Sequence, residues 1–250
     1  MKKSNLAGGL AALIILTSGS AYSAVSRDSA SAVNGSLQAT KDALDLPMLE
    51  RVSTLRGQPH AYDNLKHIMF SKSNSMDLRW KAVTAIGRIG KEKAKSDLLS
   101  ALQAREWYMR NAGLIALANV DRAESLVWAR KLLSDRALVV RSAAVDMIAQ
   151  SHDAGSSMLL WQKLYSKENY RNKQSLFIRR RIVETLADLE GKGAESKLVG
   201  VLQDKDKSLH EPAMEALERI TKRTVGTPGE PTEFRRAKWE QWYKENKATL

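Results

Sequence analysis

The chain has 250 residues, of which 43% are hydrophobic, and carries 40 basic against 28 acidic side chains. It contains no cysteine and only four histidines, which excludes disulfides, cysteine nucleophiles and thiolate metal sites and leaves little material for a histidine metal centre. An apolar fraction of this size predicts a folded chain, with one large domain or two small ones.

The first 24 residues have the order of a secretory signal peptide. Lys2 and Lys3 precede an uncharged, mainly apolar run from Leu6 to Thr17. Ala21 and Ser23 follow at the positions of the small residues that a signal peptidase recognises. The run is shorter than the roughly 20 residues of a membrane-spanning helix. We therefore predict a cleaved signal peptide and a periplasmic or secreted protein without a stable membrane span; an uncleaved anchor is the alternative.

The next segment, residues 25–44, is predicted to be a flexible lead-in. Between Ser26 and Thr40 it is rich in Ser, Ala and Asn and shows no strong apolar period.

A repeated helical pattern occupies residues 45–225. Arg79 is followed by Ala82, Val83 and Ile86 at offsets of three, four and seven residues, and later arginines are followed by apolar residues at the same offsets. Apolar residues three and four apart predict amphipathic helices. Successive copies start 31 residues apart, except for one interval of 38, at Met48, Arg79, Arg110, Arg141, Arg179 and His210.

Each copy holds a second helical stretch, such as the one marked by Leu98 and Leu102. One helix pair cannot bury both of its apolar faces alone, but stacked pairs can. The pattern therefore predicts an all-α fold, an α-solenoid of about six helix pairs. Glycines between the two helices are expected to serve as left-handed C-caps; they are Gly87, Gly90, Gly155, Gly191 and Gly193.

Residues 78–87, with the sequence LRWKAVTAIG, resemble the HEAT-like repeat found in phycobilisome lyases and many bacterial proteins. That pattern has an acidic turn residue, then an arginine, then alanines; Asp77 with Arg79 and Asp135 with Arg141 are similar to it. The resemblance implies an α-α superhelix. It also implies that Arg79, Arg110 and Arg141 form a hydrogen-bond ladder between adjacent repeats, with ligand binding as the alternative role. Arg179 or Arg180 would continue the ladder, whereas His210 departs from it.

The seven extra residues of the longer interval fall in the loop between the fourth and fifth pairs. The segment from Tyr165 to Arg181 places cations beside aromatic side chains and contains one acidic residue, Glu168. This combination suits an anionic or glycan-like partner, through charge-assisted hydrogen bonds and stacking; a solvated loop is the alternative. The candidate partner-binding residues are Tyr165, Tyr170, Arg171, Lys173, Arg179, Arg180 and Arg181.

The C-terminal residues 226–250 are predicted to form a linker and a capping helix. A stretch rich in Gly and Pro ends the repeat pattern, and a helix is expected from about Thr232, as its N-cap, to Asn246. Trp239 and Trp242 on this helix either pack as a cap for the terminal repeat or offer an aromatic pair to a partner.

The sequence lacks the Ser-elbow, phosphate-loop and metalloprotease motifs. The His210-Glu211 pair is similar to the His-Glu pairs that bind two irons in deoxyhypusine hydroxylase, which this repeat resembles. A lone pair cannot supply the ligands of such a centre, so we interpret it as a surface turn before Pro212. We predict no catalytic residue, no cofactor and no metal.

These observations together favour a non-catalytic, exported binding or scaffold protein. The expected partner is another envelope protein. The alternative is an anionic envelope polymer or lipid head group that binds the basic inserted loop, because a basic exported protein has little access to nucleic acid. A lyase or a metal-dependent hydroxylase is the least expected function.

Overall fold

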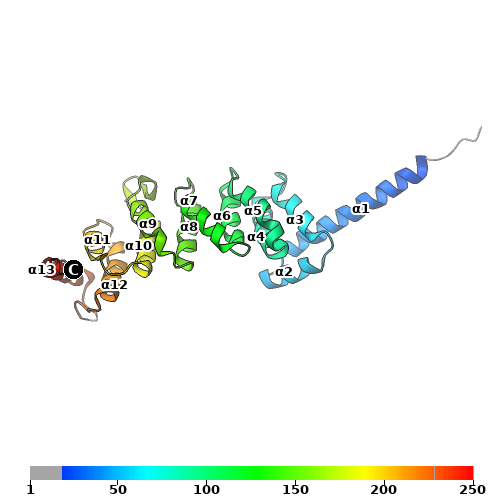
Figure 1. The fold of residues 1–250 in the computed structure, drawn as a ribbon. Coiled ribbons are helices and arrows are strands. Elements are labelled where there is room, and N and C mark those ends of the chain that lie inside the picture. Colours follow the sequence, from blue (N-terminus) through cyan, green and yellow to red (C-terminus); the bar gives the residue numbers. More distant parts are fainter. Residues whose placement is uncertain (1–18, 228, 250) are drawn as a thin grey trace, which may run out of the picture.

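The computed structural model describes residues 19–227 and 229–249 (Figure 1). Residues 1–18, which make up most of the predicted signal peptide, lie outside the described residues. The described part is mostly helical, which confirms the all-α prediction. Its only strands are the two-residue β1 (Tyr170–Arg171) and β2 (Gln174–Ser175), which form an antiparallel hairpin in the predicted insertion.

Six pairs of helices follow one another in chain order after a long first helix, α1 (Gly19–Leu44). Short 3-10 turns, η1 (Lys91–Ala94), η2 (Ala154–Ser156), η3 (Lys167–Asn169) and η4 (Lys207–Leu209), join some of them. The pairs are α2 (Met48–Gly57) with α3 (Ala61–Phe70), α4 (Met76–Gly90) with α5 (Lys95–Leu102), α6 (Trp107–Leu117) with α7 (Arg122–Leu132), α8 (Leu138–Gln150) with α9 (Ser157–Leu164), α10 (Ile178–Leu189) with α11 (Glu195–Val201), and α12 (His210–Thr221) with α13 (Thr232–Asn246).

The pairs are stacked into an elongated molecule (Figure 1). The first helices of successive pairs contact one another in order, from α2–α4 to α10–α12, and each second helix from α3 to α11 packs against the first helix of the following pair. The loops that lead from one pair into the next lie along one edge, at the top of the view in Figure 1. We call this the inter-pair edge.

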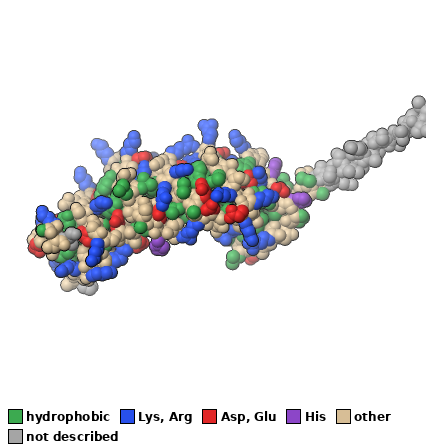
Figure 2. All heavy atoms as spheres, viewed as in Figure 1, with side chains coloured by type: hydrophobic (Ala, Val, Ile, Leu, Met, Phe, Trp, Pro, Cys, Tyr) green, Lys and Arg blue, Asp and Glu red, His purple; other side chains and the backbone are tan. Residues whose placement is uncertain are grey.

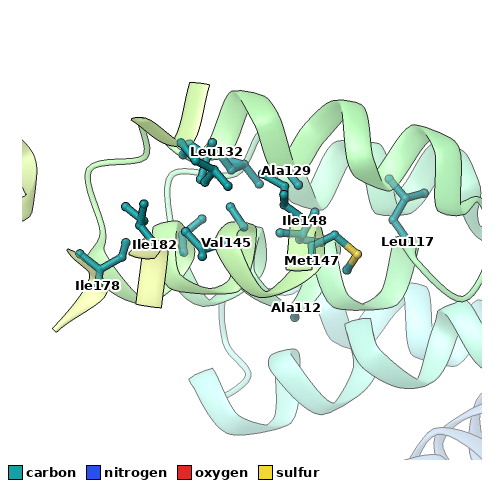
Figure 3. Close-up of a cluster of buried hydrophobic side chains, with 14 of the residues drawn as sticks. Ala112, Leu117, Ala129, Leu132, Val145, Met147, Ile148, Ile178 and Ile182 are labelled. Atoms are coloured by element: carbon teal, nitrogen blue, oxygen red, sulfur yellow. The ribbon is translucent and has the colours of Figure 1, made fainter. Parts of the chain in front are cut away.

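The apolar stripes of the repeat form the core. Ala82, Val83 and Ile86 on α4 are completely buried, and so are the residues at the same offsets on α8, α10 and α12. Figure 3 shows Ala129 and Leu132 of α7 lying against Ile148 of α8, with Val145 nearby. Each pair thus buries its apolar faces against its neighbours, as the spacing of the sequence predicted.

The end of the predicted flexible lead-in is instead ordered as the last turns of α1. Thr40 and Leu44 are completely buried there, and α1 contacts α2, α3 and α4. Thr40 accepts a hydrogen bond from Asn64 and donates one to Gln58. The sequence signal is weak because this helix is polar and rich in alanine, so that few apolar positions mark the turns that pack around Thr40 and Leu44.

Two glycines expected as C-caps lie inside α4 and are needed for close packing instead. A Cβ atom at Gly87 would lie 2.9 Å from the Ala116 carbonyl oxygen, and one at Gly90 would lie 2.4 Å from the Tyr62 ring. Gly155 lies in η2, and of the five glycines only Gly193 has a positive φ, at 95°. Two of the five glycines, Gly87 and Gly90, therefore mark close contacts between neighbouring helices, and Gly193 is the one with the left-handed backbone expected of a C-cap.

The C-terminal helix α13 has the predicted bounds, Thr232–Asn246, and completes the sixth pair by contacting α11 and α12. Its N-cap position is occupied by Pro231, and Thr232 makes no capping hydrogen bond. The expected Thr232 cap is wrong because Thr232 is already part of the helix, so that the non-helical N-cap position falls on Pro231, whose side chain has no hydrogen-bonding group.

Candidate functional site: the inter-pair edge

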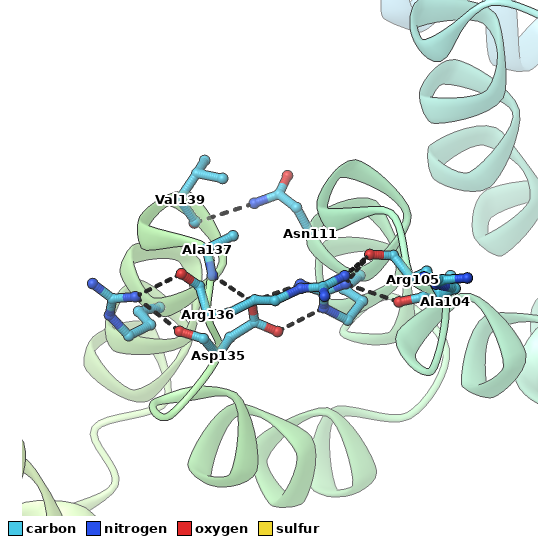
Figure 4. Close-up of polar contacts among 9 residues, drawn as sticks. Ala104, Arg105, Asn111, Asp135, Arg136, Ala137 and Val139 are labelled. Atoms are coloured by element: carbon cyan, nitrogen blue, oxygen red, sulfur yellow. Dashed lines mark hydrogen bonds and ion pairs between the residues drawn. The ribbon is translucent and has the colours of Figure 1, made fainter. Parts of the chain in front are cut away.

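A row of buried arginines joins consecutive helix pairs along the inter-pair edge. The fourth residue of α6 is Arg110, whose guanidinium donates hydrogen bonds of 2.8 Å to the carbonyl oxygens of Ala104 and Arg105. The same guanidinium holds both carboxylate oxygens of Asp135, in the next loop, at 2.6 and 2.7 Å (Figure 4). Arg110 therefore connects the loop before its own helix to the loop after the following one.

The neighbouring arginines repeat this arrangement. Arg79 donates to the Met69 carbonyl oxygen at 2.9 Å and to the Glu106 carboxylate at 3.1 Å. Arg141 donates to the carbonyl oxygen of Asp135 at 2.8 Å and to the Asn169 side chain at 3.0 Å. The structure thus places Arg79, Arg110 and Arg141 in contacts between repeats, where their guanidinium groups are buried and occupied.

The carboxyl group of Asp135, the ion-pair partner of Arg110, is stabilised in its charged form. Burial raises the pKa of the Asp135 carboxyl, but hydrogen bonds from Arg110 and from the Ala137 backbone lower it more, so the net pKa lies below its usual range. The pKa of Arg110 is raised, chiefly by its hydrogen bond to Asp135. The pair is therefore fully ionised at neutral pH and bidentate, which is the geometry that gives arginine–carboxylate pairs their strength.

The structure places Arg51 and Asp77 differently from the sequence analysis. Arg51, the fourth residue of α2, is buried and donates to the Leu46 carbonyl oxygen at 3.1 Å, so it holds in the first pair the helix position that Arg110 holds in the third. Asp77 pairs with Lys81 at 2.7 Å instead of joining the ladder.

His210, which we interpreted as part of a surface turn, is buried at the start of α12. Its Nε2 donates to the Asp204 carbonyl oxygen at 2.9 Å, six residues back, as Arg110 does to Ala104. Glu211 is bound by Arg235 at 2.5 Å. His210 therefore takes the ladder position in the last pair, and no group of three or more potential metal ligands forms around the His-Glu pair within the described part of the chain.

The insertion folds as the β1–β2 hairpin, with Tyr170 paired to Ser175. Its turn residues, Asn172 and Lys173, have φ of 51° and 66°, the left-handed values of a two-residue hairpin turn. Asparagine tolerates this conformation, whereas lysine adopts it at a cost. The tight turn directs the hairpin tip away from the core.

Arg179 lies at the base of the hairpin and is structural. Its guanidinium is almost completely buried, 4.5 Å from the Tyr170 ring centroid and 5.5 Å from that of Tyr165. It also binds Asp204 across to the next pair. Of the predicted partner-binding residues, Tyr165, Tyr170 and Arg179 are thus assembled into one cation–π cluster that continues the ladder.

The remaining basic candidates divide into two groups. Arg180 pairs with Glu184 at 2.8 Å and Arg181 with Asp146 at 2.7 Å, on the exposed face of α10. Arg171 and Lys173, at the hairpin tip, are exposed and form no ion pair with any described residue. Among the predicted partner-binding residues, only Arg171 and Lys173 therefore present cations that a partner could bind without breaking an ion pair within the described chain.

A groove of about 870 Å³ lies between the hairpin and the loop that precedes α12. Lys173 and Phe177 line one side, and Lys205 and Asp206 line the other. The pKa of the Asp206 carboxyl is lowered, although burial alone would raise it, by hydrogen bonds from Ser175 and Ser208. The groove therefore carries both signs of charge.

The tryptophan pair of α13 lies in packing contacts. Trp239 is completely buried, and Trp242, half-buried, meets it edge to face with ring centroids 5.3 Å apart. This placement fits a cap for the terminal pair, and Trp239 offers no exposed surface to a partner.

Among residues 19–227 and 229–249, no group of three or more potential metal-ligand side chains comes together. No helix in this part of the chain combines the length and the apolar character needed to cross a membrane. No protein-family model matches the chain, and a comparison with curated proteins finds no match.

Proposed function

We propose that the chain is a HEAT-like α-solenoid that acts as a non-catalytic binding or scaffold protein. The observation that carries this proposal is the ladder of Arg79, Arg110, Arg141 and Arg179, which joins every helix pair from the second to the sixth through buried side chains. Such joints favour a long edge with a fixed shape, which is the property that a scaffold needs.

The signal-like N-terminus supports export, and the proposed partner is another protein of the cell envelope. An anionic envelope polymer is the second candidate, favoured by the exposed and unpaired Arg171 and Lys173 at the hairpin tip. The two candidates differ in salt dependence, because contacts between exposed charges weaken as ionic strength rises.

Affinity capture from an envelope extract at two salt concentrations tests the proposal. Capture of one protein at both concentrations supports a scaffold. Retention of polymer that is lost at high salt, and that Arg171→Gln with Lys173→Gln abolishes, supports the second candidate. Purification of the chain with a bound metal or pigment would contradict both and point to an enzyme.

A further inference from the structure

The inter-pair edge carries a second row of cations outside the buried ladder. Three loops contain an acidic and a basic neighbour: Arg105-Glu106, Asp135-Arg136 and Asp204-Lys205. In each loop the carboxylate binds the buried arginine of the preceding pair. The basic side chain is exposed and has no carboxylate partner among the described residues. In these three loops the ladder thus uses the acidic neighbour and leaves the basic one without a carboxylate partner.

The buried ladder also fixes where these cations stand. Arg110 donates to the carbonyl oxygen of Arg105, and Arg141 donates to that of Arg136, at 2.8 and 3.3 Å. Arg136 in turn donates to the carbonyl oxygen of Arg105, so these two loops lie side by side. Figure 2 shows Lys and Arg side chains projecting along the edge on which Figure 1 places the loops.

After each of four loop cations, an exposed apolar side chain stands at or near the start of the following helix. Exposed fractions are 52% for Met76, 42% for Trp107, 43% for Val139 and 66% for Phe177. Each follows a cation by two to four residues in the sequence. We call the set of exposed cations and apolar residues the outer row; it consists of Lys72, Met76, Arg105, Trp107, Arg136, Val139, Lys173, Phe177 and Lys205.

We infer that the outer row binds an extended acidic polypeptide that also carries apolar side chains. Packed helices lie about 8–10 Å apart, and an extended chain advances about 3.1–3.3 Å per residue. One acidic and one apolar side chain in every three residues or so would therefore meet one cation and one apolar residue per helix pair. The inference rests on the proposed scaffold function and names the chemistry of its partner.

Two other anionic partners match the outer row less well. A polyphosphate chain supplies charge but has no apolar group to cover Trp107 and Phe177. An anionic membrane offers both, but it presents a plane, whereas the outer row is a single line of loops along one edge. A linear partner with alternating chemistry satisfies both features.

Fluorescence anisotropy of a labelled 15-residue peptide, five Glu-Pro-Leu units, tests this inference on the purified full chain. In an extended conformation the peptide is about 45 Å long and spans four to five pairs. We expect saturable binding that weakens with salt. Binding should weaken about tenfold or more in Arg105→Glu with Arg136→Glu, because two exposed pairs are replaced by repulsion.

The matched control is Arg88→Glu with Lys192→Glu, which makes the same change of charge at the opposite ends of helix pairs, at exposed positions in the last turn of α4 and after α10. It should bind as the unsubstituted chain does, and thermal unfolding checks that both variants are folded. Trp107→Ser with Phe177→Ser should also weaken binding while leaving every charge in place. Equal binding of a Glu-Pro-Gly peptide would overturn the apolar part of the inference, and hence the inference.

Polyphosphate and vesicles containing phosphatidylglycerol complete the test. Binding of either one without binding of the acidic peptide would overturn the inference in favour of that partner. Capture of an envelope protein that is unchanged by Arg105→Glu with Arg136→Glu would overturn the outer row but leave the scaffold proposal standing. Loss of capture by every variant, including the control, would instead count against the scaffold proposal.

Discussion

Removal of the Asp135 carboxylate tests how the helix pairs are held together. In Asp135→Ala, the buried guanidinium of Arg110 loses two hydrogen bonds of 2.6 and 2.7 Å and keeps those to Ala104 and Arg105. The side chains of the pair are only 6% and 8% exposed. Breaking a buried pair by removing one partner costs about 3–5 kcal/mol of unfolding free energy. Because Arg110 keeps two hydrogen bonds, we expect a loss at the lower end of this range, about 3 kcal/mol.

The assay is urea unfolding followed by circular dichroism, with the free energy of unfolding taken from the midpoint and slope. Asp146→Ala is the matched control, because the Asp146–Arg181 pair has the same charges but is 43% and 45% exposed, and such pairs contribute only about 0–1 kcal/mol. Replacing both buried partners, as Asp135→Leu with Arg110→Met, should recover part of the loss. Equal effects of Asp135→Ala and Asp146→Ala would refute the ladder as a stabilising joint.

Three further predictions concern the core, the acid stability and the helix contacts. Leu117→Ala should lower the free energy of unfolding by about 2–5 kcal/mol, because Leu117 is completely buried; an unchanged urea midpoint would contradict the repeat alignment. The pKa of Asp135 is lower in the folded state than its ordinary 3.8, so the folded state binds fewer protons and stability should fall as pH drops below about 4. Acid titration of Asp135→Ala should show a smaller fall, and an identical one would exclude this carboxyl as a cause. Gly90→Ala should lower the melting temperature because its Cβ would meet the Tyr62 ring, whereas Gly191→Ala, with open space around it, should not.

The helices and the recurrence of the arginines could be predicted from the sequence because both depend on spacing, whereas the ladder was implied by the resemblance to HEAT-like repeats. Apolar side chains at every third or fourth position share one face of a helix, and this face is buried when helices pack together. The stripes around Val83 and Leu217 are therefore buried, as their spacing predicted. The ladder arginines share the same offset from these stripes, and their burial follows from it.

The features that were missed depend on contacts between distant segments. The last turns of α1 are ordered by Asn64 and Gln58, far from them in the sequence, and the sequence of α1 itself carries little apolar signal. His210 replaces an arginine in the ladder because its ring reaches the Asp204 carbonyl oxygen, which a search for arginine cannot detect. Arg51 could have been recognised because it is the fourth residue of the helix that begins after Pro47, as Arg79 is the fourth residue of α4.

The candidate site was predicted only in part for a related reason. Density of basic residues identified the hairpin, but it did not distinguish Arg179, which is buried, from Lys173, which is exposed. The outer row was missed because its members are single residues in separate loops. Arg105, Arg136 and Lys205 each stand next to an acid that binds a ladder arginine, and this feature becomes visible only when the partners of those acids are known.

Photo-crosslinking in cells that express the full chain tests the central claim, that the inter-pair edge binds a partner, most directly. A photoreactive amino acid is placed at Trp107 or at Phe177, on the inter-pair edge, and for comparison at Lys192, at the opposite end of a pair. We expect the same crosslinked protein from both edge positions and none from position 192. Crosslinks from position 192 alone, or from no position, would contradict the claim.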